Sequence, residues 1–99
     1  MAKATANYES VVIFSVMNGE ENITALTEKF KSLISANGTI TNVEEWGKRR
    51  LAYPINDEVE GFYLFVEFSC APEFPAELDR IYKITDGVLR SLIVVKNED

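Results

Sequence analysis

The most concentrated charge in the chain is the tripeptide Lys48-Arg49-Arg50, which places three cationic side chains next to one another. Guanidinium and ammonium groups bind phosphate, so these residue types predict contact with a polyanion. Because side chains alternate along an extended segment, Lys48 and Arg50 are expected on one face and Arg49 on the other. Arg90 and Lys96 are two further candidate phosphate contacts near the end of the chain.

A purely structural role for the cluster is about equally compatible with the sequence. Three carboxylates, those of Asp57, Glu58 and Glu60, lie where a hairpin would bring them opposite the cations. Exposed pairs of this kind contribute little to stability. Trp46, close before the cluster, could stack on a base, but a tryptophan at such a position more often packs against its own sheet.

The composition excludes several kinds of active site. The chain has no histidine, and Cys70 is its single cysteine, so it offers no Ser-His or Cys-His nucleophile pair and no zinc site of its own. The segment 17–21 reads MNGEE, whose carboxylates repel phosphate, unlike the phosphate-cradling loop of the acylphosphatase type of enzyme. We therefore predict a protein that is not an enzyme and that holds no metal, cofactor or small-molecule ligand.

The chain as a whole is acidic, in contrast to the cluster. Ten Lys and Arg residues stand against sixteen Asp and Glu residues, which gives a net charge of −6 at pH 7. With 99 residues it is long enough for one domain, and its charge excludes bulk attraction to a polyanion. No apolar run approaches the length of a membrane span, and a lone cysteine suits a reducing compartment, so we expect a cytoplasmic protein without a membrane partner.

Hydrophobic periodicity divides the chain into alternating strands and helices. Strands are expected at 8–17, 39–55, 62–69 and 88–96, and helices from Glu20 to a glycine cap at Asn37-Gly38 and from Pro75 to Asp86-Gly87. Ile40 and Val43 have opposite parity, so the long second strand needs a bulge, for which Gly47 is the natural candidate. Residues 56–61 are expected to form a polar hairpin connection.

The second helix is expected to bury Phe74, Leu78, Ile81 and Ile84, with Asp79 and Lys83 paired on its exposed side. The order β-α-β followed by β-α-β predicts an α+β, ferredoxin-like fold, in which a four-stranded antiparallel sheet carries two helices on one face. We expect one domain at 8–96, preceded by a flexible segment at 1–7 and followed by a short acidic tail at 97–99.

Apolar residues occur on both faces of the expected sheet, although two helices can cover only one of them. In the third strand Phe62, Leu64, Val66 and Phe68 can face the helices, which leaves Tyr63 and Phe65 pointing away. The last strand places Val88, Leu92 and Val94 on one side and Leu89, Ile93 and Val95 on the other. Such a patch on an uncovered sheet is more often a docking surface than a solvated one, the alternative being that edges and termini shield it.

Residues 47–55, GKRRLAYPI, resemble the signature of a bacterial ribosomal protein family, that of the sixth protein of the small subunit. The signature has the form Gly, variable, basic, charged, Leu, Ala, Tyr, variable, Ile. Segments 43–46, 60–63 and 86–90 extend the resemblance, which reaches from Tyr8 to Lys96. It implies a ferredoxin-like, non-catalytic constituent of the ribosome.

The resemblance also implies partners. Members of the family enter the platform of the small subunit as a heterodimer with the strongly basic eighteenth protein of that subunit, and they bind the central domain of the small-subunit ribosomal RNA. On this hypothesis the candidate RNA contacts are Lys48, Arg49, Arg50, Arg90 and Lys96. The candidate contacts with the partner protein are Tyr53, Tyr63 and Phe65.

Two other hypotheses remain open at this point. A free-standing RNA-recognition domain has the same order of elements, but Glu60 and Tyr63 stand where its third-strand motif has a basic and a small residue. A regulatory domain that pairs through its sheet would need a ligand loop, which the sequence does not show. A homodimer with a specific ligand would distinguish the second of these.

Overall fold

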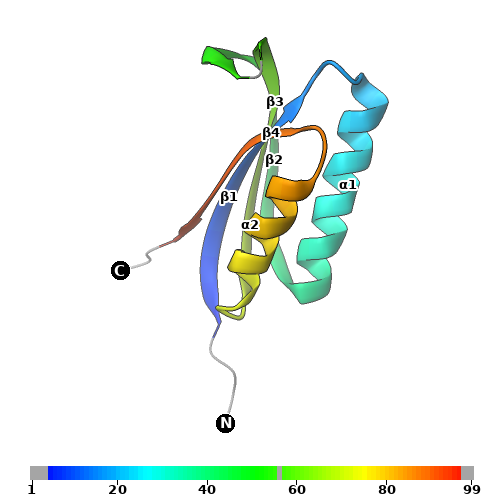
Figure 1. Cartoon of the computed structure of the whole chain (residues 1–99). Helices are drawn as coiled ribbons and strands as arrows, with labels where there is room; N and C mark the ends of the chain where they lie inside the picture. The colour runs from blue at the N-terminus through cyan, green and yellow to red at the C-terminus, as the bar shows by residue number, and fades with distance from the viewer. Residues whose placement is uncertain (1–4, 56, 97–99) are drawn as a thin grey trace.

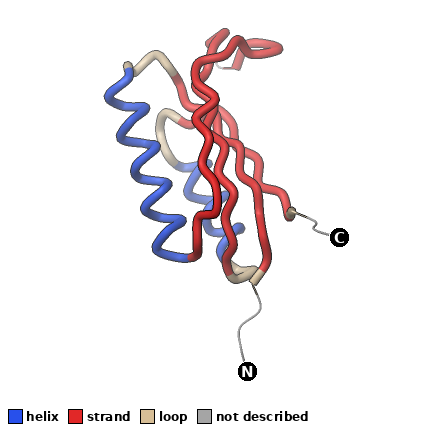
Figure 2. Tube along the Cα trace, turned by 180° about the vertical axis from the view of Figure 1, so that it is seen from behind, coloured by secondary structure: helices blue, strands red, loops and turns tan. Residues whose placement is uncertain are grey.

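The fold is a four-stranded antiparallel sheet with both helices on one face. The computed structural model describes residues 5–55 and 57–96. Its elements are β1 (Ala6–Ser15), α1 (Glu20–Asn37), β2 (Gly38–Ile55), β3 (Glu58–Cys70), α2 (Phe74–Ile84) and β4 (Val88–Val95). The strand order is β2-β3-β1-β4, and Figures 1 and 2 show the two helices side by side on the same side of the sheet. This confirms the predicted ferredoxin-like α+β architecture.

The described part of the chain begins just before β1 and ends just after β4. Residues 1–4 and 97–99, which contain most of the expected flexible segment and the whole acidic tail, lie outside the described residues. β1 begins at Ala6, before the predicted start at Tyr8, because Ala6 already pairs with Cys70 of β3. Neither helix of the described part is both long and apolar enough to cross a membrane.

The core lies between the helices and the covered face of the sheet. Phe30 of α1 packs between Phe14 of β1 and Tyr82 of α2, with ring centroids 6.0 Å and 4.6 Å away. The Tyr82 hydroxyl would be costly to bury alone, but it shares a hydrogen bond of 2.8 Å with the buried Ser10 hydroxyl. Aromatic packing and one satisfied polar pair therefore fix both helices on the sheet.

The end of α1 differs from the predicted glycine cap. Gly38 has φ −172°, which is extended backbone, and it is the first residue of β2 rather than a left-handed cap. A side chain at this position would overlap the Ser69 carbonyl and the Cys70 side chain across the strand pair. Gly38 is therefore required by the close approach of β2 to β3, and the chain passes from helix to strand without a loop.

The buried stripe of α2 consists of Phe74, Leu78 and Tyr82, which are four residues apart. The prediction that Ile84 belongs to this stripe is wrong, since its side chain is 67% exposed, and Tyr82 takes the buried place instead. Ile81 is half-buried beside the stripe, as partly expected. The buried stripe of α2 therefore ends at Tyr82, and Ile84 lies on the exposed side of the helix.

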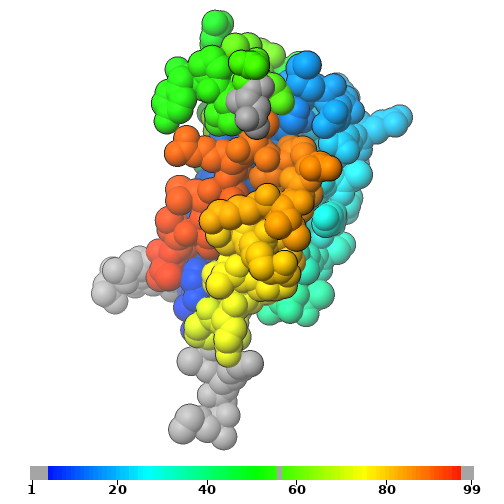
Figure 3. All heavy atoms as spheres, viewed as in Figure 1, coloured from blue at the N-terminus to red at the C-terminus, as the bar shows by residue number. Residues whose placement is uncertain are grey.

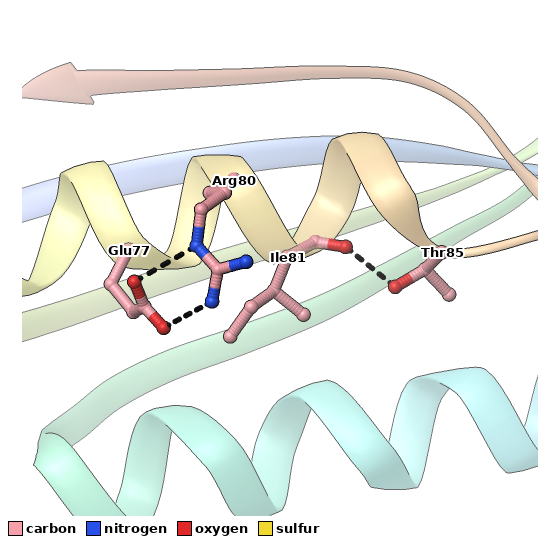
Figure 4. A network of polar contacts seen from close by, with 4 residues as sticks. All are labelled: Glu77, Arg80, Ile81 and Thr85. Atoms are coloured by element: carbon pink, nitrogen blue, oxygen red, sulfur yellow. Dashed lines mark hydrogen bonds and ion pairs between the residues drawn. The ribbon is translucent and has the colours of Figure 1, made fainter.

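The exposed side of α2 carries the pairs that helical spacing allows. Asp79 and Lys83 form the predicted ion pair at 2.8 Å. Glu77 accepts two hydrogen bonds from Arg80, at 3.1 and 2.6 Å, and the Thr85 hydroxyl donates to the Ile81 carbonyl at the end of the helix (Figure 4). These contacts are solvated, so they stabilise α2 only slightly.

The β2-β3 hairpin is longer than predicted, and its register shifts at three places. A bulge at Gly47 is confirmed, since Glu45 pairs with Leu64 and Gly47, with φ 84°, pairs with the adjacent Tyr63. It is not the bulge that the parity of Ile40 and Val43 requires, because a separate shift between Ile40 and Asn42 brings those two residues to the same face. β3 begins at Glu58, so the prediction of a polar connection over 56–61 is wrong, with Asn56 outside the described residues. Residues 51–54 have no register partner, because they lie between the pairs Arg50–Glu60 and Ile55–Glu58.

A further bulge changes the faces of β4. Val88 pairs with Phe14, and Arg90 pairs with Ile13, so Leu89 is an extra residue in the strand. Val88 and Ile93 consequently both pack against the core, although their parity differs. The prediction that Val88 shares a face with Leu92 and Val94 is therefore wrong.

Candidate functional site

The candidate site is the face of the sheet that the helices leave uncovered, which we call the open face. Alternation along the strands brings Val11 and Ile13 of β1 and Tyr63 and Phe65 of β3 to it. These residues are half-buried or buried, so parts of the open face are covered by something other than the helices. Two segments of β2 provide that cover.

The first cover is Trp46, at the Gly47 bulge. Its indole stacks on Phe65 with ring centroids 5.2 Å apart and planes within 8°. The indole nitrogen donates to the Glu44 carboxylate at 2.8 Å. This hydrogen bond, with a second from Asn42, holds the pKa of the Glu44 carboxyl below its usual range. Trp46 therefore packs on its own sheet, as expected, and it leaves Phe65 half-buried.

The second cover is the hairpin tip, defined as residues 51–55. Leu51 is buried, and with Tyr53 and Tyr63 it encloses a small space beside Ile13. Gly61 makes this possible, because a side chain there would overlap the Ile13 methyl group and touch Leu51. Figure 1 shows the end of the hairpin bent away from the line of its strands, and Figure 3 shows its atoms against the β4 segment.

Tyr53 of the hairpin tip reaches β4. Its hydroxyl accepts a long hydrogen bond, 3.4 Å, from Arg90, while its ring remains 63% exposed. The hydrogen bond and the charge of Arg90 lower the pKa of the Tyr53 phenol. The structure thus brings a candidate partner contact, Tyr53, together with a candidate RNA contact, Arg90.

The remaining part of the open face, over β4, is apolar and uncovered. Leu92, which is 59% exposed, pairs with Val11 of β1, and Val94, which is 41% exposed, lies two residues further along β4 on the same face. We call these three residues the β4 patch. Below it Lys96 forms an ion pair of 2.8 Å with Glu67, which lowers the pKa of that carboxyl. Lys96 is therefore paired with a carboxylate of this chain.

The basic cluster divides between the two faces as predicted. Arg49 lies on the open face, with its guanidinium carbon 5.5 Å from the centroid of the Trp46 ring. Lys48 lines a groove of about 380 Å³ on the helix side, together with Glu20 and Glu45. Arg50 stands opposite Glu60 in the register.

The alternative weighed for the cluster, pairing with the hairpin carboxylates, is not observed in the described residues. No ion pair links the three cations to Asp57, Glu58 or Glu60 among the residues that the structure describes. Glu58 accepts a hydrogen bond of 2.7 Å from the Ser15 hydroxyl instead. In the described part of the chain these carboxylates therefore do not neutralise the three cations, and Glu58 is held by β1 instead.

Other chemistry finds little support in this geometry. No group of three or more Asp, Glu, Cys or His side chains that could bind a metal occurs within 5–55 and 57–96. Cys70 is buried, and burial raises the pKa of its thiol, which agrees with a packed residue rather than a nucleophile. The covering of the open face by Leu51 has no signal in the local sequence, because it depends on Gly61 across the hairpin.

Comparisons with known proteins agree with this geometry. A family model described as Ribosomal protein S6 matches residues 7–95. The small ribosomal subunit protein bS6 of Clostridium beijerinckii is 51% identical over 88 residues, which cover 88% of this chain and 93% of the relative. That of Caldanaerobacter subterraneus is 48% identical over 89 residues, covering 89% and 94%. The crystal structure of 30S ribosomal protein S6 from Thermotoga maritima has a TM-score of 0.88 at 30% identity, covering 94% of this chain and 89% of that one.

The fold and the open face define a class of small ferredoxin-like domains that present one bare sheet surface. Within that class, the match over nearly the whole chain is specific. This chain belongs to the ribosomal protein S6 family. The resemblance inferred from residues 47–55 is confirmed, and the family is not a class of enzymes.

Proposed function

We propose that the protein is a structural constituent of the small ribosomal subunit, where it binds the central domain of the small-subunit RNA together with a basic partner protein. The partner is the eighteenth protein of that subunit. This function lies on the ribosome and therefore in the cytoplasm. Membership of the ribosomal protein S6 family is the observation that carries the proposal.

The distribution of charge supports two partners rather than one. A net charge of −6 opposes binding to a long polyanion, but it attracts a strongly basic protein and speeds its association. Lys48, Arg49 and Arg50 form a local exception that suits a few phosphate contacts. RNA binding by the pair therefore combines the partner's charge with a small contact from this chain.

The apolar surface supports a protein partner on the open face. The β4 patch is solvent-exposed, and Tyr53, Tyr63 and Phe65 border it with aromatic side chains, which are frequent anchors at protein interfaces. Glu9 lies on the same face by alternation and complements a basic molecule, whereas Glu67 beside it is already paired with Lys96. The RNA contacts proposed for this chain are the basic cluster and Arg90, with Lys96 tied to Glu67.

The alternative of a free-standing RNA-recognition domain receives no support from the open face. Such domains stack bases on free aromatic rings of the first and third strands. Here Trp46 covers Phe65, and β1 offers Val11 and Ile13 rather than rings. The open face is better suited to a protein than to stacked bases.

Binding measurements with purified components test the proposal. The isolated chain should bind a central-domain RNA fragment weakly, and adding the basic partner should produce a tight ternary complex over a salt series. Co-sedimentation of the tagged chain with small subunits from cells checks that the protein is bound to the small subunit. Equal RNA affinity with and without the partner would contradict the proposal.

A further inference from the structure

We propose that Arg49 is the residue of the basic cluster that grips an RNA phosphate and that Trp46 is its positioning residue. This inference rests on the proposed function, because it names the contact through which the chain touches RNA. The juxtaposition that carries it is a three-part stack on the open face, in which Phe65 supports Trp46 and Trp46 supports Arg49.

The stack holds Arg49 from two directions. Its guanidinium carbon lies 5.5 Å from the Trp46 ring centroid, within the range of a cation–π contact. Its Nε donates to the Trp46 carbonyl oxygen at 3.4 Å. The two terminal nitrogens form no ion pair with any residue in the described part of the chain, so the fork that binds phosphate remains unoccupied.

Trp46 is itself fixed, which makes it a suitable support. One side of its ring lies on Phe65, and its indole nitrogen is bonded to Glu44. The Gly47 bulge, with φ 84°, lets Trp46 project onto the open face beside the regular pair Glu44–Phe65. Only 37% of Trp46 is exposed, so little of its own surface is left for direct stacking on a base.

The other two cations are placed less favourably. Lys48 borders a groove that also contains Glu20, Glu28 and Glu45, whose carboxylates oppose a phosphate. Arg50 stands opposite Glu60, and no aromatic ring is recorded against it in the residues described. A long side chain loses rotamer freedom when it binds, and Arg49 has already lost part of that freedom, so phosphate binding costs least at this position.

Four variants in the complex of chain, basic partner and central-domain RNA test the inference. Arg49→Lys keeps the charge but removes the fork and the bond to the Trp46 carbonyl, so RNA affinity should fall about tenfold with an unchanged salt slope. Arg50→Lys, the comparison within the basic cluster, should lose less affinity than Arg49→Lys, because Arg50 has no stacked support to lose in the described part of the chain. Trp46→Leu should lose about as much as Arg49→Lys, whereas Trp46→Phe, which keeps a ring for the cation, should retain most of the affinity.

Thermal melting of each variant and its affinity for the partner alone separate positioning from folding. The inference predicts that Trp46→Leu weakens RNA binding more than partner binding. Equal effects of Arg49→Lys and Arg50→Lys, or full RNA affinity in Trp46→Leu, would overturn it. If the wild-type complex does not bind the RNA at all, the proposed function fails; if it binds and Arg49→Lys is silent, only this inference fails.

Discussion

The two faces of the sheet are built from the same strands but by different rules. On the covered face, Val12, Phe14, Leu64 and Val66 are fully buried against the helices. On the open face, neighbouring residues of the same strands are partly covered by the chain itself, through Trp46 and the hairpin tip, or not covered at all, as in the β4 patch. The covered face serves stability, and the open face retains apolar area for a partner.

The difference shows what alternation along a strand can accomplish. A substitution at one position mainly changes the free energy of folding, and a substitution at the next mainly changes what the surface binds. If this is correct, substitutions on the two faces should separate into losses of stability and losses of binding.

The covered face should give the largest loss of stability. Phe30→Ala removes a fully buried ring that packs on Phe14 and Tyr82, so the free energy of unfolding should fall by about 3–5 kcal/mol. Phe65→Ala removes a ring of equal size from the open face and should cost about 1 kcal/mol, because that ring is half-exposed. Urea unfolding followed by circular dichroism measures both. Equal losses would show that the open face contributes as much to folding as the covered one.

The β4 patch should show the opposite behaviour. Leu92→Ser combined with Val94→Thr removes exposed apolar area, so stability should change by less than about 1 kcal/mol while affinity for the basic partner falls by about 1–4 kcal/mol. Tyr63→Ala with Phe65→Ala is expected to weaken the same complex. Calorimetric titration of folded variants checks this. Unchanged affinity in the Leu92 and Val94 variant would place the partner elsewhere.

Much of the fold could be predicted from the sequence, because the apolar period changes clearly between strands and helices. The wrong assignment of faces in β4 has a definite physical cause. A single extra residue reverses the face of everything beyond it, and the bulge at Leu89 depends on how β4 pairs with β1 rather than on any local signal. Gly47 could be located because glycine marks bulges by its own conformational freedom.

The site could be predicted in part. Alternation correctly separated Arg49 from Lys48, and Trp46 was expected to pack on its sheet. The covering of the open face by the hairpin tip could not be predicted. It depends on Leu51 lying beside Gly61 of β3, where the absence of a side chain leaves room for it. Contacts between distant segments leave no periodic signal in either segment.

Where the hairpin tip contacts the open face, a substitution should reduce stability as it does on the covered face. Gly61→Ala would push a methyl group into Ile13, which is buried there, and should cost about 1–3 kcal/mol. Ile13→Ala removes the obstructing methyl, so the double variant should be more stable than the sum of the two losses by about 1 kcal/mol. Additive losses, measured by urea unfolding, would mean that Gly61 is required for another reason.

Two tyrosines give the finest comparison of the faces. Burial raises the pKa of Tyr82, which packs on the covered face from α2, from 10.0 to about 12. The hydrogen bond from Arg90 lowers the pKa of Tyr53, on the open face. A pH titration of the tyrosine ring carbons by NMR should therefore resolve one phenol that ionises below the usual value and one that stays neutral well above it.

The raised pKa of Tyr82 also makes a prediction about stability. Its neutral form is favoured in the folded state, so this contribution is present in full below pH 10 and is lost as the pH rises towards 12. Between those values the free energy of unfolding should fall by about 1 kcal/mol per pH unit on account of this group. Tyr82→Phe should remove that part of the decline while losing the bond to Ser10, whereas Tyr53→Phe should leave the decline intact. If Tyr53→Phe removed the decline in stability and Tyr82→Phe did not, the open face rather than the covered one would govern stability at high pH.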